Sequence, residues 1–315
     1  MDRLKKLILG DQGLVVIFAV AFVLVSALVP NFLTERNMLG LLQSVVTIGI
    51  VAGSMMLCLA SRDFDLSVGS TVAFAGMMAV MASNWTGSVM LGVLLALACG
   101  LIVGVANGVV IAKLKINALI TTLATMQIVR GLALITSGGQ AVGIDDPGFY
   151  QIALTKLFGV PMPIWVLLVS FAAFGFLLNR TVFGRNTLAI GGNPDASRLA
   201  GVDVSKTRIM IFAIQGLMCA IAGILLASRI TSGQPNAAQG LELSVISACV
   251  LGGVSLAGGR ATISGVIVGV LIAGIAENVM NLLNIPAFYQ YLVRGVILLL
   301  AVLLDNLRSR ALRPS

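Results

Sequence analysis

The chain has 315 residues, of which 58% are hydrophobic and 10% are charged, and its net charge is +8. A soluble globular domain carries about 25% charged residues. This composition therefore excludes a soluble domain and predicts that lipid covers part of the protein surface. The apolar runs are continuous, which excludes a membrane β-barrel. The sequence contains no histidine, so the commonest general base and zinc ligand is absent.

Ten apolar stretches, taken in chain order, predict ten transmembrane helices of roughly 20 residues each. They cover residues 13–30, 38–60, 67–83, 88–112, 116–136, 161–179, 208–231, 241–257, 262–281 and 287–305. Lysine and arginine gather in every second connection, which predicts that both termini are cytoplasmic. The positive charge is therefore a topology signal, because the basic residues form no stripe with interleaved aromatics of the kind that binds nucleic acid.

Two connections are longer than a turn requires. The connection 137–160 is expected outside and contains Asp145 and Asp146, whereas 180–207 is expected in the cytoplasm and is rich in positive charge.

Four short strings occur twice in the same order, which indicates an internal repeat. The pairs are 59–62 with 226–229, 65–68 with 242–245, 100–105 with 265–270, and 129–131 with 293–295. The repeats cover 38–136 and 208–305 of a single transmembrane domain, 1–315. Because they are five helices apart, the second runs in the opposite direction. Such inverted-topology repeats are typical of transporters, whose substrate path lies between the two halves.

Polar residues interrupt the apolar runs at corresponding points of the two repeats. Asp63, Asp65 and Ser67 stand at the first interruption, and Glu242 and Ser244 follow the second. Polar backbone at membrane depth is tolerated where protein or water surrounds it, so these residues are candidates for the substrate path or its gates. Helix capping by the two carboxylates is an equally good interpretation.

Arg130, Glu277 and Arg294 fall inside predicted helices. A charge near the bilayer centre is costly and marks a functional or a paired site. A structural ion pair between Glu277 and Arg294 is the favoured interpretation.

Glycines four residues apart are expected to pack helices closely rather than to contact substrate. They are Gly100, Gly104 and Gly108 in the first repeat, and Gly265 and Gly269 in the second.

The segment 193–202, NPDASRLAGV, resembles the cytoplasmic coupling loop of ABC importer permeases. In that loop an alanine and a glycine five residues later mark a short helix that docks into the ATPase, and here Ala196 and Gly201 occupy these places. Asn193 and Arg198 belong to the same segment. A helix that ends at a glycine forms a compact projection, which suits the transmission of rigid-body motion.

Further segments resemble the monosaccharide permeases of the ribose, galactose, xylose and arabinose importers. They are 64–68, 116–123, 183–186 and 244–253, and segments 113–130, 232–235 and 277–284 are closest to the arabinose branch. The resemblance implies a type II importer-like, all-α permease in the bacterial inner membrane. It also implies a second permease copy, a cytoplasmic ATP-binding subunit and a periplasmic sugar-binding protein, with no nucleotide site or cofactor in this chain.

Two other classes of protein compete with the ABC permease. A secondary transporter with the same repeats would carry titratable coupling groups deep in the membrane, and an intramembrane enzyme would need a catalytic constellation. The sequence shows neither a G-x-S-x-G nor an H-E-x-x-H motif. Arabinose is the expected sugar by resemblance, and ribose, xylose and galactose are the alternatives.

Overall fold

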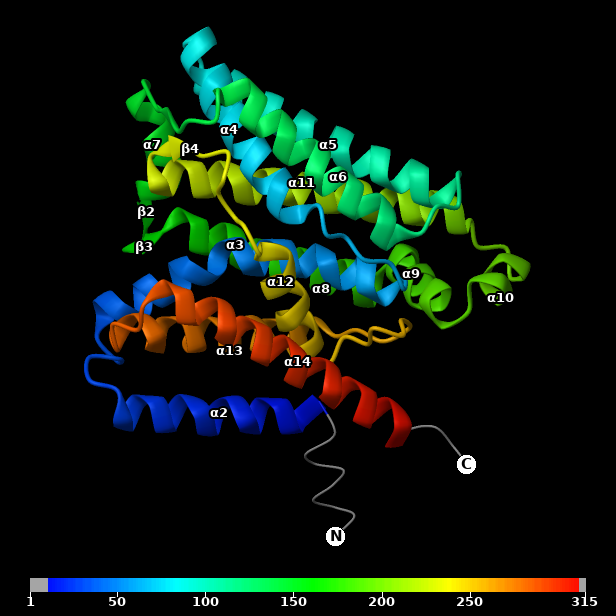
Figure 1. The fold of residues 1–315 in the computed structure, drawn as a ribbon. Coiled ribbons are helices and arrows are strands. Elements are labelled where there is room, and N and C mark those ends of the chain that lie inside the picture. Colours follow the sequence, from blue (N-terminus) through cyan, green and yellow to red (C-terminus); the bar gives the residue numbers. More distant parts are fainter. Residues whose placement is uncertain (1–10, 312–315) are drawn as a thin grey trace.

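The computed structural model describes residues 11–311. Most of its long helices run roughly along one long axis (Figure 1). One end carries α7 (Pro147–Leu154) and the short strands and is called the α7 end. The other carries α9 (Val182–Gly192) and α10 (Pro194–Leu199) and is called the α10 end. The termini expected in the cytoplasm, 1–10 and 312–315, lie outside the described residues.

The first half of the chain forms five long helices. They are α2 (Asp11–Leu28), α3 (Glu35–Ala60), α4 (Val68–Thr86), α5 (Val89–Ala112) and α6 (Ala118–Ser137). Side chains at their starts accept hydrogen bonds from free backbone N–H groups: Thr34 caps α3, Ser88 caps α5 and Asn117 caps α6. Glycines with left-handed φ angles end α4 and α6.

The two long connections are both structured. The first holds β1 (Val142–Gly143), α7 (Pro147–Leu154), β2 (Lys156–Leu157) and β3 (Val160–Pro161), and α8 (Met162–Arg180) follows it. The second holds α9 (Val182–Gly192) and α10 (Pro194–Leu199). Strands β2 and β3 form a small antiparallel hairpin.

The second half contains α11 (Val204–Ile230), β4 (Ser232–Gly233), α12 (Leu241–Leu251), α13 (Ile263–Leu282) and α14 (Ala287–Ala311). Strand β4 pairs antiparallel with β1, with Val142 opposite Gly233 and Gly143 opposite Ser232. The connection before α7 is therefore bonded to the segment between α11 and α12.

A helix lies at each of the ten ranges expected from the sequence. Among the described residues, six helices are long and apolar enough to cross a membrane, namely α3, α5, α6, α8, α11 and α13. Helix α12 is shorter than the expected span 241–257, because Gly252 and Gly253 end it and Gly253 has a φ of 84°.

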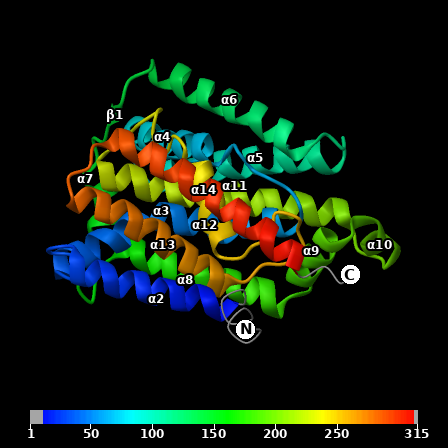
Figure 2. The same cartoon turned by 60° about the horizontal axis from the view of Figure 1, so that its bottom comes forward.

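Helix α11 occupies the middle of the bundle, packed against α3, α4 and α5. Helix α6 lies at the edge (Figure 2) and packs against α4 and α5. The close packing expected of the glycines is confirmed. A Cβ on Gly100 would lie 2.7 Å from Ala220 Cβ on α11, and one on Gly108 would lie 2.7 Å from Ile209 Cα. Gly269 packs in the same way against Ala248 of α12, and Gly265 packs against Gly252 directly after that helix.

Candidate functional site

Two non-helical segments interrupt the bundle. The first break, residues 61–67, joins α3 to α4, and the second break, residues 231–240, joins α11 to α12. The first starts at the α10 end and the second at the α7 end, and each leads to the start of its next helix inside the bundle (Figure 1).

The second break meets the first turn of α4. A Cβ built on Gly69 would lie 2.5 Å from Ala238 O and 2.6 Å from Glu242 Oε2. No residue larger than glycine fits there without a shift of its neighbours. The first turns of α4 and α12, which follow the two breaks, therefore contact each other.

Hydrogen bonds within the first break and from α5 and α6 hold it in place. Asp65 is 2% exposed, and its Oδ1 accepts from the backbone N–H of Ser67 at 2.9 Å and from the Ser67 hydroxyl. Ser67 Oγ in turn accepts from Asn107 Nδ2 at 3.0 Å, and Asn107 Oδ1 accepts from Thr125 Oγ1 at 2.6 Å. A chain of three hydrogen bonds thus runs from α6 through α5 to the buried carboxylate.

The second break is held by a residue of α6. The guanidinium of Arg130 donates through Nη1 to the carbonyl oxygens of Pro235 and Ala237, the latter at 3.0 Å. Glu242, in the first turn of α12, is half-buried. Ser244 donates to Gly240 O at 3.3 Å, so its hydroxyl helps to close the start of α12.

The other two charged residues predicted inside helices are neighbours. Arg294 Nη2 lies 3.1 Å from Glu277 Oε1, and the Arg294 guanidinium carbon lies 5.9 Å from the centre of the Tyr291 ring. A cavity of about 20 Å³ touches this pair and also Ser244 and Ser247. The structure therefore contains the ion pair considered from the sequence, next to a candidate path residue.

An open cavity of about 580 Å³ lies at the α10 end. Its wall includes Asp63, Asn117, Arg208 and, from the α10 segment, Asp195 and Arg198. It is bounded by the first break, the α5–α6 connection and the start of α11, so it adjoins both the break and the predicted coupling segment.

Asp63 forms an ion pair in the wall of this cavity. Its Oδ2 lies 3.0 Å from Arg208 Nε, without the alignment of a hydrogen bond, and it accepts from the Ser61 hydroxyl at 3.3 Å. Burial raises the pKa of Asp63 to about 6, although Arg208 and Ser61 act in the opposite direction. Desolvation of the carboxylate is therefore the larger effect.

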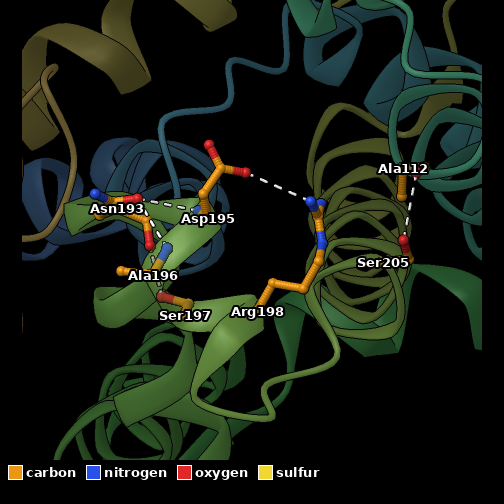
Figure 3. Close-up of polar contacts among 7 residues, drawn as sticks. All are labelled: Ala112, Asn193, Asp195, Ala196, Ser197, Arg198 and Ser205. Carbon is orange, nitrogen blue, oxygen red and sulfur yellow. Dashed lines mark hydrogen bonds and ion pairs between the residues drawn. The ribbon is translucent and has the colours of Figure 1, made fainter.

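The predicted coupling segment forms a short helix, as expected (Figure 3), and this helix projects from the end of the bundle (Figure 1). Asn193 Oδ1 accepts from the backbone N–H groups of Asp195 and Ala196 at 3.0 Å each, and Arg198 pairs with Asp195 at 3.4 Å on the surface. Gly201 closes the segment with a φ of 86°, which favours glycine. Leu199 is 91% exposed.

Behind α10, three glycines form what we call the glycine junction: Gly191, Gly258 and Gly259. The N–H of Gly259 donates to Ala60 O at 2.9 Å, and a Cβ on Gly191 would overlap the same carbonyl. Arg62 reaches over the junction to Ala257 O and Gly192 O. The ends of α3 and α9 and the turn after α12 therefore touch through backbone atoms.

Sequence reasoning missed Asn107, Thr125 and Arg208. Asn107 stands beside the glycine pattern of an apolar run, Thr125 is one of several threonines in its helix, and Arg208 belongs to the positive charge that predicts the topology. A polar residue inside an apolar run was the available signal for Asn107.

The family described as "Branched-chain amino acid transport system / permease component" matches residues 37–302. The L-arabinose transport system permease protein AraH of Escherichia coli (strain K12) is 57% identical over 304 residues, which cover 96% of this chain and 93% of the relative. The L-arabinose ABC transporter permease protein AraH of Azospirillum brasilense is 52% identical, over 97% of this chain and 90% of the relative.

The ribose import permease protein RbsC of Escherichia coli (strain K12) is 38% identical over 305 residues, covering 95% of this chain and 94% of the relative. No solved structure matches the chain. With a family match across most of its length and relatives well above 30% identity, the chain belongs to the family of transport-system permease components.

Proposed function

We propose that the chain is the permease subunit of an ATP-driven importer of L-arabinose, which passes the sugar from a periplasmic binding protein to the cytoplasm. The observation that carries this proposal is the difference in identity among its relatives. Two L-arabinose permeases share 57% and 52% of their residues with this chain, whereas a ribose permease of similar coverage shares 38%.

Uptake into proteoliposomes tests the proposal. The chain is reconstituted with an ATP-binding subunit inside and an arabinose-binding protein outside, and labelled L-arabinose uptake is measured with and without ATP. We expect uptake that needs all three proteins and ATP. Uptake without the ATP-binding subunit would instead identify a secondary transporter. Uptake of ribose, xylose or galactose, but not of arabinose, would refute the choice of sugar.

We further propose that the chain crosses the inner membrane ten times as two inverted repeats, with both termini in the cytoplasm. Support comes from the helices at all ten expected ranges and from the two breaks, which start at opposite ends of the bundle. Single cysteines at Gly143 and Asn193 test the orientation in intact cells. An impermeant reagent should modify the cysteine at Gly143 and not that at Asn193; the reverse pattern would overturn the topology.

The substrate path, in this proposal, passes the place where the two breaks meet. Asp65, Ser67, Glu242 and Ser244 all lie in or directly after a break. A sugar needs hydrogen-bond partners but no counter-charge, and weak binding lets it leave. The hydroxyl, carboxylate and backbone groups at the starts of α4 and α12 suit that requirement.

The α10 segment is our proposed docking site for the ATP-binding subunit. It projects from the end of the bundle (Figure 1), and the apolar side chain of its Leu199 is 91% exposed. We also propose that a second copy of the chain, together with lipid, covers the apolar outer side of the bundle. Size determination of the purified complex with subtraction of bound detergent tests the homodimer, and a single permease copy per complex would refute it.

A further inference from the structure

Both breaks are linked to α6 by hydrogen bonds, a feature that the proposed path does not use. Thr125 lies on the buried face of this helix, and its hydroxyl starts the chain of hydrogen bonds that passes through Asn107 and Ser67 to Asp65. Arg130, five residues further along, binds the carbonyl oxygens of Pro235 and Ala237 in the second break.

The direction of the hydrogen bonds leaves little freedom in the first break. Thr125 donates to Asn107 Oδ1, which turns the Asn107 amide so that Nδ2 donates to Ser67 Oγ. The Ser67 hydroxyl is then left to donate to Asp65. Ser67 and Asn107 are each 1% exposed, so water does not replace a lost partner. Loss of the Thr125 hydroxyl would leave Asn107 Oδ1 unpaired and free the amide to turn.

The contact in the second break crosses between the two halves of the chain. Arg130 belongs to the first half, and the carbonyls that it binds lie just before Ala238 and Glu242, which contact Gly69 at the start of α4. Since α6 otherwise packs against α4 and α5, a shift of α6 would move both breaks together.

We propose that Asn107, Thr125 and Arg130 are positioning residues of transport, which hold both helix breaks against α6 so that the two move as one unit. This inference rests on the proposed transport function but concerns the coupling between the breaks and is independent of which sugar is carried. The alternative is that these bonds only satisfy buried polar groups, each within its own break.

A reporter in the second break distinguishes the two. Asn236 is exposed and lies between the two carbonyls bound by Arg130, so a cysteine at Asn236 reports local opening through its rate of thiol modification. The half-buried Cys99 is replaced by alanine in this background, whereas the other three cysteines are buried. The assay uses the full complex in proteoliposomes and needs no sugar.

Thr125→Val removes the hydroxyl without changing the size of the side chain. Among the described residues the Thr125 hydroxyl donates to Asn107 and to no group of the second break, so a role confined to the first break predicts an unchanged rate at Asn236. Our proposal predicts that the rate changes by about fivefold, the effect of losing one hydrogen bond. Arg130→Met should raise the rate directly, and Thr125→Ser, which keeps the hydroxyl, should restore the wild-type rate.

The matched control is Thr121→Val. Thr121 lies on the same helix and is buried, but its hydroxyl has no hydrogen-bond partner among the described residues. This variant should leave the rate unchanged. Equal rates in the wild type and Thr125→Val, or equal changes in Thr125→Val and Thr121→Val, would overturn the proposal.

Transport gives a second readout in the same vesicles. Uptake per ATP hydrolysed should fall in Thr125→Val and Arg130→Met and stay normal in Thr121→Val, because unfastened breaks let ATP hydrolysis proceed without passage of sugar. If these two variants lose thermal stability while uptake per ATP is unchanged, Asn107, Thr125 and Arg130 have only a structural role. If the wild-type complex carries no arabinose, the sugar assignment fails alone, because the Asn236 measurement still tests the coupling.

Discussion

Gly69→Ala places one methyl group at the contact between the two breaks. The added Cβ would lie 2.5 Å from Ala238 O and 2.6 Å from Glu242 Oε2, whereas an unstrained carbon–oxygen contact is about 3.3–3.6 Å. The Glu242 side chain can turn away, but the Ala238 carbonyl is backbone, so the second break must move by about 1 Å. Overpacking of this kind costs about 1–3 kcal/mol, and the better helix propensity of alanine returns at most about 1 kcal/mol.

Thermal unfolding in detergent measures the loss of stability. A dye that fluoresces on reaction with thiols reports unfolding, because Cys58, Cys219 and Cys249 are buried in the native protein. We expect a lower midpoint than in the wild type and, in proteoliposomes, a loss of uptake per folded molecule. Gly40→Ala is the control, since a Cβ there meets no atom within 4 Å. A Gly69→Ala variant that matches Gly40→Ala in both assays would refute the contact between the breaks.

Three further predictions concern the site. Gly201→Asp puts a charged side chain on a residue with left-handed φ in the α10 segment, so sugar-stimulated ATP hydrolysis and uptake should fall while the permease still inserts; normal uptake would remove this segment from the mechanism. In Asp65→Asn and Glu242→Gln, a gating role predicts normal folding with transport lost, whereas capping alone predicts a loss of about 0.3–1 kcal/mol with near-normal transport per folded molecule. Burial raises the pKa of Asp63 to about 6 from an ordinary value of 3.8, so between these pH values the native protein binds a proton that the unfolded chain does not. Lowering the pH from 7 to 5 should therefore stabilise the wild type relative to Asp63→Asn, by about 1.4 kcal/mol at most per unit of pKa difference. Unfolding midpoints that change with pH by the same amount in the two proteins would contradict this.

The positions of the helices followed from the sequence because long apolar runs are separated by clear breaking and capping residues. Gly87 and Gly138 end their helices in left-handed conformations, and Thr34 and Asn117 start theirs. The end of α12 did not follow, because the run after Leu251 stays apolar and only its glycines stop the helix.

Some residues of the site were predictable from the sequence, but the hydrogen bonds between them were not. Local patterns identified Asp65, Glu242 and Arg130, because polar residues are conspicuous in apolar runs. The contacts that join the breaks to α5 and α6 link distant parts of the chain: Asn107 is 40 residues from Ser67, and Pro235 is 105 residues from Arg130. Such pairings depend on how the helices pack, and no spacing rule within one helix encodes them.

The glycine junction behind α10 also restricts how this protein can change over evolution. Any side chain at Gly191 would overlap the Ala60 carbonyl, and Gly258 has a φ of 79° and no room beside the Arg62 side chain. No other amino acid fits at these two positions unless the three segments that meet there move together. We therefore expect a change in the transported sugar to come from residues elsewhere in the bundle, while these glycines stay in place.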